Sequence, residues 1–70
     1  MSNLYYINPD TSKNPKNNNE VHELGCDKMP DEKEYLGLFD SDIDAVEYAK
    51  ENNWLDADGC ATCCPDAHEE

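Results

Sequence analysis

Apolar residues gather in short clusters separated by long polar stretches. Leu4–Ile7 is a run of aromatic and β-branched residues, which is typical of a strand. Glu20–Leu24 is a second candidate strand, expected to run antiparallel to the first. Glu34–Phe39 carries apolar residues on both of its faces, which predicts a central strand covered by a helix on one side. The pattern therefore predicts a small antiparallel sheet of about three strands.

Two glycines mark places where these strands should be interrupted. In an extended strand, residues four apart lie about 13 Å from each other, so His22 and Cys26 can approach each other only if the chain turns between them. Gly25 permits that turn because glycine tolerates positive φ. The second strand is therefore expected to end near Leu24. Gly37 is expected to mark a bulge or a close approach of backbones in the third strand.

One amphipathic helix should follow the third strand. Ser41 is a suitable N-cap, and Asp44 stands three residues later, as in a capping box. This capping role explains the carboxylates at 40, 42 and 44 better than catalysis or calcium binding does. Asn52 and Asn53 should end the helix. The residues expected to face the sheet are Ile43, Ala45, Val46 and Ala49, with Tyr48 at the edge. One helix beside one sheet gives an α+β fold.

The remaining segments are connections and ends. Residues 8–19 hold two prolines among Asn, Ser and Asp, which predicts a flexible loop. Trp54–Leu55 should form an apolar anchor before the last cysteines, and Asp58–Gly59 is a typical turn dipeptide. Residues 66–70 are expected to be a frayed tail. The whole chain, 1–70, is then one small domain.

The composition favours a fold that is stabilised by a disulfide or a bound metal ion. The chain has 70 residues, of which 37% are apolar, and its mean hydropathy is -0.98. Chains this short and polar struggle to bury enough apolar surface to offset the conformational entropy lost on folding. Small domains of this kind usually contain a disulfide or a metal ion. The four cysteines are the candidates for either.

The charge restricts the class of partner. Seventeen acidic residues against five basic ones give a formal net charge of -12. Proteins that bind nucleic acids or anionic membranes gain affinity from Lys and Arg, so we expect neither partner here. No apolar stretch approaches the roughly 18 residues of a membrane span. A protein partner, and a basic one in particular, is compatible with this charge.

Histidine and cysteine residues form two short-spaced pairs. His22-x3-Cys26 and Cys60-x2-Cys63 together offer the four N/S donors that tetrahedral Zn2+ takes in structural sites. His22 could instead be a polar residue on a half-exposed strand. Residues 1–7 show no secretory signal, so we expect a cytoplasmic protein, in which thiols stay reduced and more often bind metal than form disulfides.

Three alternatives remain open at this point. Cys64 could replace Cys63 as a ligand, and His68 could replace His22. The cysteines could form disulfides, with three possible connectivities. Cys60 and Cys63 could also form a redox pair, although Pro65 and the acidic surroundings do not suit the helix N-terminus at which such pairs usually work.

The order of these features resembles the metal-binding domain of the Ada family and its small zinc-binding relatives. The residues that carry the resemblance lie between 20 and 65: His22-x3-Cys26, Phe39-Asp40-Ser41-Asp42-Ile43-Asp44-Ala45 and Cys60-Ala61-Thr62-Cys63-Cys64-Pro65. It implies a zinc site held by His22, Cys26, Cys60 and Cys63 in an α/β scaffold.

Two departures from the Ada pattern limit what the resemblance implies. The family's first ligand is a cysteine that accepts a methyl group from damaged DNA phosphate, and here His22 stands in its place. The family's basic residues beside the second cysteine pair are replaced by Ala61, Thr62 and Cys64. DNA repair therefore does not carry over. We expect a monomeric, non-catalytic zinc module that serves as a protein-interaction or accessory domain.

Overall fold

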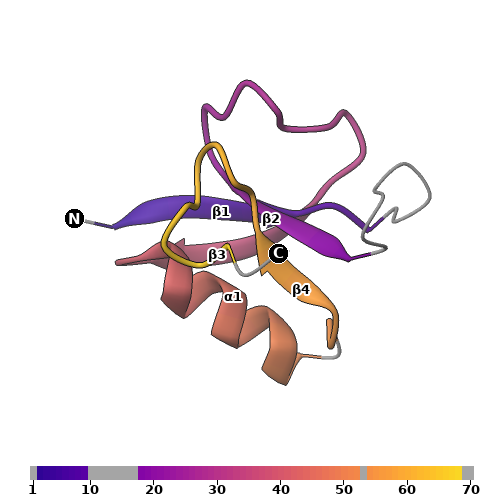
Figure 1. The fold of residues 1–70 in the computed structure, drawn as a ribbon, viewed down its shortest axis with the longest axis vertical. Helices are drawn as coiled ribbons and strands as arrows, with labels where there is room; N and C mark the ends of the chain where they lie inside the picture. Colours follow the sequence, from indigo (N-terminus) through magenta and orange to yellow (C-terminus); the bar gives the residue numbers. More distant parts are fainter. Residues whose placement is uncertain (1, 10–17, 53, 69–70) are drawn as a thin grey trace.

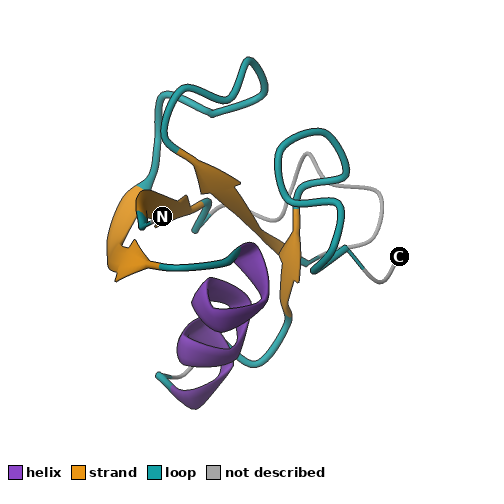
Figure 2. Ribbon diagram, turned by 90° about the vertical axis from the view of Figure 1, so that its left-hand side faces the viewer, coloured by secondary structure: helices purple, strands orange, loops and turns teal. Residues whose placement is uncertain are grey.

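The computed structural model describes residues 2–9, 18–52 and 54–68. Its elements follow one another as four strands and one helix (Figure 1). They are β1 (Asn3–Ile7), β2 (Asn19–Glu23), β3 (Glu34–Phe39), α1 (Asp42–Glu51) and β4 (Ala57–Gly59). The helix packs on one face of the sheet (Figure 2), which confirms the α+β class with a single helix.

The sheet has one more strand than the sequence predicts, and it is mixed. Its strand order is β3-β1-β2-β4, with β1 antiparallel to both β2 and β3. The additional strand, β4, contains Asp58 and Gly59, which were expected to form a turn. It pairs parallel with β2, in the register Asn19↔Ala57 to Val21↔Gly59. This direction follows from α1, which carries the chain back along the sheet before β4 begins.

β3 lies at the edge of the sheet, so the prediction of a central strand is wrong. A register shift between Tyr5 and Tyr6 leaves Leu36 as an extra residue opposite them. This bulge lies beside Gly37, whose φ of +145° confirms the predicted irregularity. Because of the bulge, Leu36 and Phe39 both pack against the core, although regular alternation would place them on opposite faces.

The helix begins as predicted. The Ser41 side chain accepts a hydrogen bond from the backbone N–H of Asp44 at 3.2 Å, and the helix ends at a C-cap on Asn52. Ala45, Val46 and Ala49 are buried, but Ile43 is 45% exposed, contrary to expectation. At 100° per residue, Ile43 lies about 110° from the centre of the buried face, too far round to reach the sheet.

The core lies between α1 and the sheet and is built largely from small side chains. Trp54 packs against it as expected, but its neighbour Leu55 is 79% exposed and anchors nothing. Ala67 is buried, within the segment predicted to fray, and its N–H donates to Asp42 Oδ2 at 3.3 Å. The buried core residues are Tyr5, Ile7, Val21, Ala45, Val46, Ala49, Ala57, Cys64 and Ala67.

The predicted loop at 8–19 is described only at its two ends, because residues 10–17 lie outside the described part of the chain. Asn19 belongs to β2 and is buried, and its Nδ2 donates to the carbonyl of Asn8 at 3.0 Å. Asn18 is also buried, and its Nδ2 donates to Asp58 Oδ2 at 3.2 Å. Two asparagines therefore fix the chain where it enters β2.

Tyr5 should make the fold sensitive to alkali. Burial raises the pKa of Tyr5 above its ordinary value of 10.0, and the Glu23 carboxylate, which accepts a hydrogen bond from the Tyr5 hydroxyl at 3.2 Å, raises it further. The unfolded chain then ionises at Tyr5 before the folded chain does. The stability that this tyrosine contributes is complete below pH 10 and is lost as the pH rises above it.

Tyr5→Phe is expected to reduce that loss of stability in alkali. The variant should be less stable by about 1 kcal/mol at neutral pH, because its hydrogen bond is missing. Its urea midpoint should then fall less than that of the parent between neutral pH and pH values above 10. Equal falls in the two proteins would show that Tyr5 is not the titrating group.

Candidate metal centre

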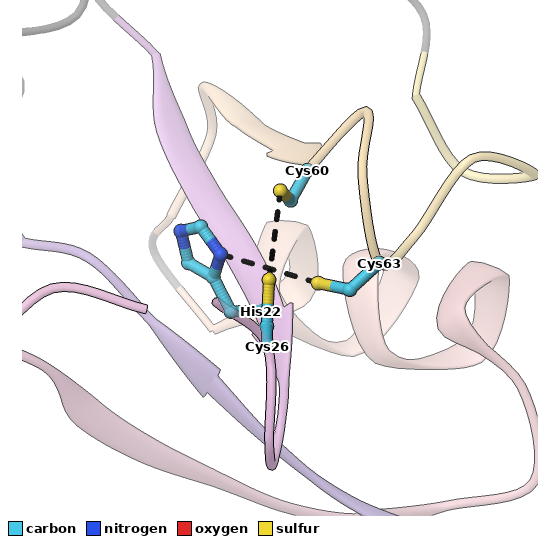
Figure 3. A group of neighbouring side chains, drawn as sticks. All are labelled: His22, Cys26, Cys60 and Cys63. Atoms are coloured by element: carbon cyan, nitrogen blue, oxygen red, sulfur yellow. Dashed lines mark hydrogen bonds between the residues drawn. The ribbon is translucent and has the colours of Figure 1, made fainter. Parts of the chain in front are cut away.

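The two His/Cys pairs come together where β2 ends beside β4. His22 lies in β2 and Cys26 follows the turn after it. Cys60 follows β4 directly, and its N–H donates to the Val21 carbonyl at 3.0 Å. This bond extends the β2–β4 ladder and places Cys60 opposite the strand that carries His22. Cys63 lies in the turn beyond it (Figure 3).

The distances within this group fit one tetrahedral metal ion. One ligand atom from each of the four residues, His22, Cys26, Cys60 and Cys63, lies within 4.8 Å of all the others. Cys26 Sγ is 4.0 Å from Cys60 Sγ, and Cys63 Sγ is 4.0 Å from His22 Nδ1. A tetrahedron with metal–sulfur bonds of about 2.3 Å has edges of about 3.8 Å. The structure thus gathers the four residues singled out by the sequence.

The turn predicted between the first two donors is present. Gly25 has a φ of +94°, and the N–H of Cys26 donates to the Glu23 carbonyl at 3.0 Å. The chain reverses there, so the Cys26 thiol returns toward the His22 ring and does not continue along the strand. The His22 and Cys26 side chains can therefore approach each other because Gly25 adopts a positive φ.

Backbone N–H groups point at two of the sulfurs. Glu23 donates to Cys63 Sγ at 3.3 Å, and Lys28 donates to Cys26 Sγ at 3.4 Å. A hydrogen bond to a charged group favours its charged form, so the Glu23 N–H opposes the effect of burial, which raises the pKa of Cys63. The Cys60–Cys64 segment is closed in turn by a 2.7 Å bond from the Cys64 N–H to the Cys60 carbonyl.

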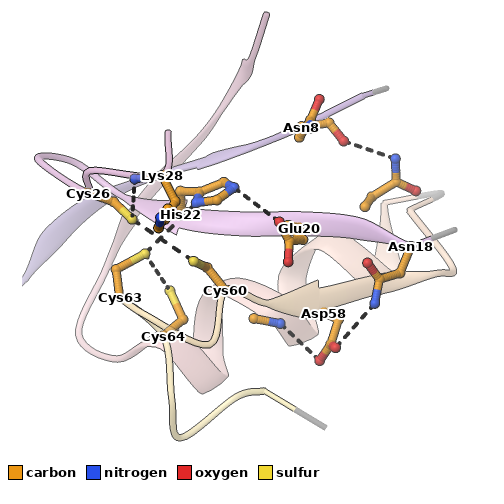
Figure 4. A network of polar contacts seen from close by, with 12 residues as sticks. Asn8, Asn18, Glu20, His22, Cys26, Lys28, Asp58, Cys60, Cys63 and Cys64 are labelled. Carbon is orange, nitrogen blue, oxygen red and sulfur yellow. Dashed lines mark hydrogen bonds and ion pairs between the residues drawn. The ribbon is translucent and has the colours of Figure 1, made fainter. Parts of the chain in front are cut away.

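His22 is buried, and a carboxylate lies near its ring. Its exposed fraction is 1%, and burial lowers its pKa from the ordinary value of 6.5, while the Glu20 carboxylate acts in the opposite direction. A neutral imidazole is the form that binds a metal. Glu20 Oε1 lies 3.8 Å from Nε2, on the far side of the ring from Cys63 (Figure 4). This arrangement favours a proton on Nε2, which leaves the Nδ1 lone pair facing the thiols.

Cys64 and His68 lie outside the group of four. Cys64 is fully buried in the core, and its Sγ is 3.7 Å from Cys63 Sγ (Figure 4). His68 Nδ1 is 2.9 Å from the Gly59 carbonyl oxygen and 3.6 Å from Asp58 Oδ2. This histidine therefore holds the end of the chain against β4.

The sulfur distances do not support the disulfide alternative. All four cysteines are free thiols, and the measured sulfur–sulfur distances of 3.7 and 4.0 Å exceed the bond length of about 2.05 Å in a disulfide. Burial raises the pKa of Cys63 well above its ordinary value and that of Cys64 to about 11. Redox-active cysteines usually have a lowered thiol pKa. The raised pKa of Cys63 therefore does not favour the redox alternative for Cys60 and Cys63.

Two features of the site were missed by the sequence analysis. Glu20, two residues before His22 on the same face of β2, is the charged neighbour of the imidazole, and this spacing could have revealed it. Asp58 is buried and accepts from Asn18 and from the Gly59 N–H at 3.0 Å. Asp58 shows no such signal, because an Asp-Gly pair suggests a turn.

Comparison with known proteins does not identify a family. No family model matches the chain, and no curated protein or solved structure matches it either. No helix in the described part of the chain is long and apolar enough to cross a membrane. The Cys/His group and the surface of the chain are therefore the features that indicate its function.

Proposed function

We propose that His22, Cys26, Cys60 and Cys63 hold one zinc ion and that the ion has a structural role. The observation that carries the proposal is the approach of four donor atoms to within 4.8 Å from two segments far apart in the sequence. Soft thiolates favour Zn2+ over Mg2+ or Ca2+, and three thiolates with one imidazole form a common structural zinc site.

A structural role is more consistent with this donor set than a catalytic one. Four protein donors fill the tetrahedral coordination of zinc and leave no position for water or substrate. The ion would connect the end of β2 with the segment after β4, and so fix the loop that covers one side of the core. The apolar core of this chain is small, and such a cross-link would supply the stability that burial does not.

The domain is proposed to act as an accessory or protein-interaction module without catalysis of its own. A charge of -12 opposes binding to nucleic acids and anionic membranes, and favours a basic protein partner. Reduced thiols would be maintained in a cytoplasmic, reducing compartment. The Ada-like order of ligands supports the zinc-binding architecture alone, since His22 cannot perform methyl transfer as a cysteine thiolate does.

Native mass spectrometry of the reduced protein tests the proposal. We expect one zinc ion per chain, removed by a strong chelator together with the dispersion of the amide NMR spectrum. Re-addition of zinc should restore both, whereas magnesium should restore neither. A rigorously metal-free, reduced sample that keeps a dispersed spectrum would overturn the structural role.

A further inference from the structure

The outer edge of β3 is open to another chain. β3 is an end strand of the sheet, and no strand among residues 2–9, 18–52 and 54–68 pairs with its outer side. It lies at the far left of the sheet in Figure 2, with β1 on its inner side. An open edge presents unpaired backbone N–H and C=O groups, which an extended segment can use for pairing.

Apolar side chains accompany this edge on the face of the sheet opposite α1. Tyr35 and Leu38 are each 60% exposed. In the β1–β3 register they stand opposite Tyr6 and Leu4, and the Tyr6 and Tyr35 rings lie 5.5 Å apart. These four residues, here named the β3 patch, would give a docked strand apolar contacts in addition to backbone hydrogen bonds.

Carboxylates stand at both ends of β3. Asp31, Glu32 and Glu34 precede or begin the strand, and Asp40 follows it. The single cation among residues 31–40, Lys33, hydrogen-bonds to the Pro30 carbonyl at 3.4 Å. A strand docked along β3 would therefore run between acidic residues and would be attracted through Lys or Arg side chains of its own.

This charge distribution also discriminates between occupants. A second copy of the chain would bring another formal charge of -12 and a second set of the same carboxylates to the edge. Like charges across an interface oppose association. We propose that β3 and the β3 patch bind an extended basic segment of a partner protein by strand addition. The proposal rests on the proposed role of the domain as a protein-interaction module.

The expected partner segment has a defined chemistry. Side chains of a docked strand alternate between the two faces of the sheet. Apolar residues at alternate positions would lie beside Tyr35 and Leu38 on the same face of the sheet, and Lys or Arg would reach the carboxylates at the strand ends. Selection of random dodecapeptides displayed on phage against the zinc-loaded protein provides the probe. We expect enriched peptides to be basic, with apolar residues at alternate positions, and to elute at high salt.

A pair of variants locates the binding site of an enriched peptide. Leu38→Lys places a cation in the β3 patch and should weaken binding by about tenfold or more. Leu55→Lys is the matched control, because Leu55 is 79% exposed and precedes β4 at the opposite edge of the sheet. It should bind as the parent does. Hydrogen exchange of the complex should slow at the amides of residues 34–39.

The other outcomes contradict the proposal. No enrichment, enrichment of acidic or neutral peptides, or equal binding to Leu38→Lys and the parent would each overturn it. A dimer detected by sedimentation, with slowed exchange at residues 34–39, would assign the edge to a second copy instead. Zinc is measured by native mass spectrometry in the same samples. If the parent protein lacks zinc but still binds these peptides at β3, the structural zinc site is refuted and the strand-addition proposal is not.

Discussion

Cys63→Ser should lose zinc and unfold the domain, whereas the same change at its neighbour Cys64 should leave zinc bound. Cys63 Sγ belongs to the group of four ligand atoms, while Cys64 Sγ is buried in the core. Structural zinc contributes an apparent 10–16 kcal/mol or so in comparable small domains, which matches or exceeds the whole stability of a typical domain, about 5–15 kcal/mol. Loss of one donor of four should therefore unfold the chain.

The two variants are measured in the same way. Zinc retention is followed in competition with a chromophoric chelator, and folding is followed by amide dispersion in NMR spectra. Cys64→Ser should lose about 1–3 kcal/mol, because it buries a hydroxyl group among apolar neighbours, and yet keep its zinc. Cys26→Ser and Cys60→Ser should behave like Cys63→Ser. If Cys64→Ser loses zinc and Cys63→Ser keeps it, then Cys64, and not Cys63, is the second ligand in this loop.

The histidines allow an equivalent comparison at the other end of the site. His22→Ala should release zinc, because Nδ1 faces Cys63 Sγ at 4.0 Å. His68→Ala removes the contact with the Gly59 carbonyl but no member of the ligand group. It should therefore lower stability moderately and retain the metal. The reverse result would assign the imidazole ligand to His68.

The parts of the fold that sequence predicted are those determined by local chemistry. Ser41 caps the helix because its hydroxyl can reach an N–H three residues ahead, whatever lies around it. Gly25 turns because its φ is free. Within each pair of candidate ligands, a short spacing and a local turn bring the two side chains together, whereas the two pairs meet because β4 pairs with β2.

The parts that sequence did not predict depend on contacts between distant segments. β4 has only three residues, Ala57–Gly59, without β-branched or aromatic side chains, and it is a strand because β2 offers a free edge. β3 is apolar on both faces, yet it lies at an edge of the sheet. Its bulge turns Leu36 toward the core, while Tyr35 and Leu38 stay exposed. Ala67 is buried because residues 64–67 pack against Gly59. No local sequence pattern indicates this contact.

Among substitutions that leave the four ligands in place, Gly59→Ala should be the most damaging small one, because residues 64–67 pack closely against Gly59. A Cβ at this position would stand 2.7 Å from the Cys64 carbonyl oxygen and 2.9 Å from Ala67 Cβ, so the backbone of the cysteine loop must move. Overpacking of this kind costs about 3 kcal/mol. Because the displaced loop carries Cys60 and Cys63, we also expect weaker zinc binding, by up to about a hundredfold if the whole cost falls on the zinc-bound state; competition with a chelator measures the change in affinity.

Comparing Gly59→Ala with Gly25→Ala separates the stability cost of crowding from the cost of backbone strain. Gly25 has a positive φ, but a Cβ added there would meet no atom within 4 Å, so alanine should cost only the left-handed penalty of about 1–2 kcal/mol. Urea unfolding of both variants measures the difference. A larger cost at Gly25 than at Gly59 would show that the packing against Gly59 can relax.

A double-mutant cycle then tests which contact causes the loss at Gly59. Ala67→Gly removes one of the two atoms nearest to the added Cβ. If contact with Ala67 contributes to the crowding, Ala67→Gly should cost less stability in the Gly59→Ala background than in the parent. Strict additivity of the two changes would exclude the Ala67 side chain and leave backbone atoms, the Cys64 carbonyl oxygen at 2.7 Å and the Ala67 carbonyl carbon at 3.0 Å, as the groups that alanine displaces.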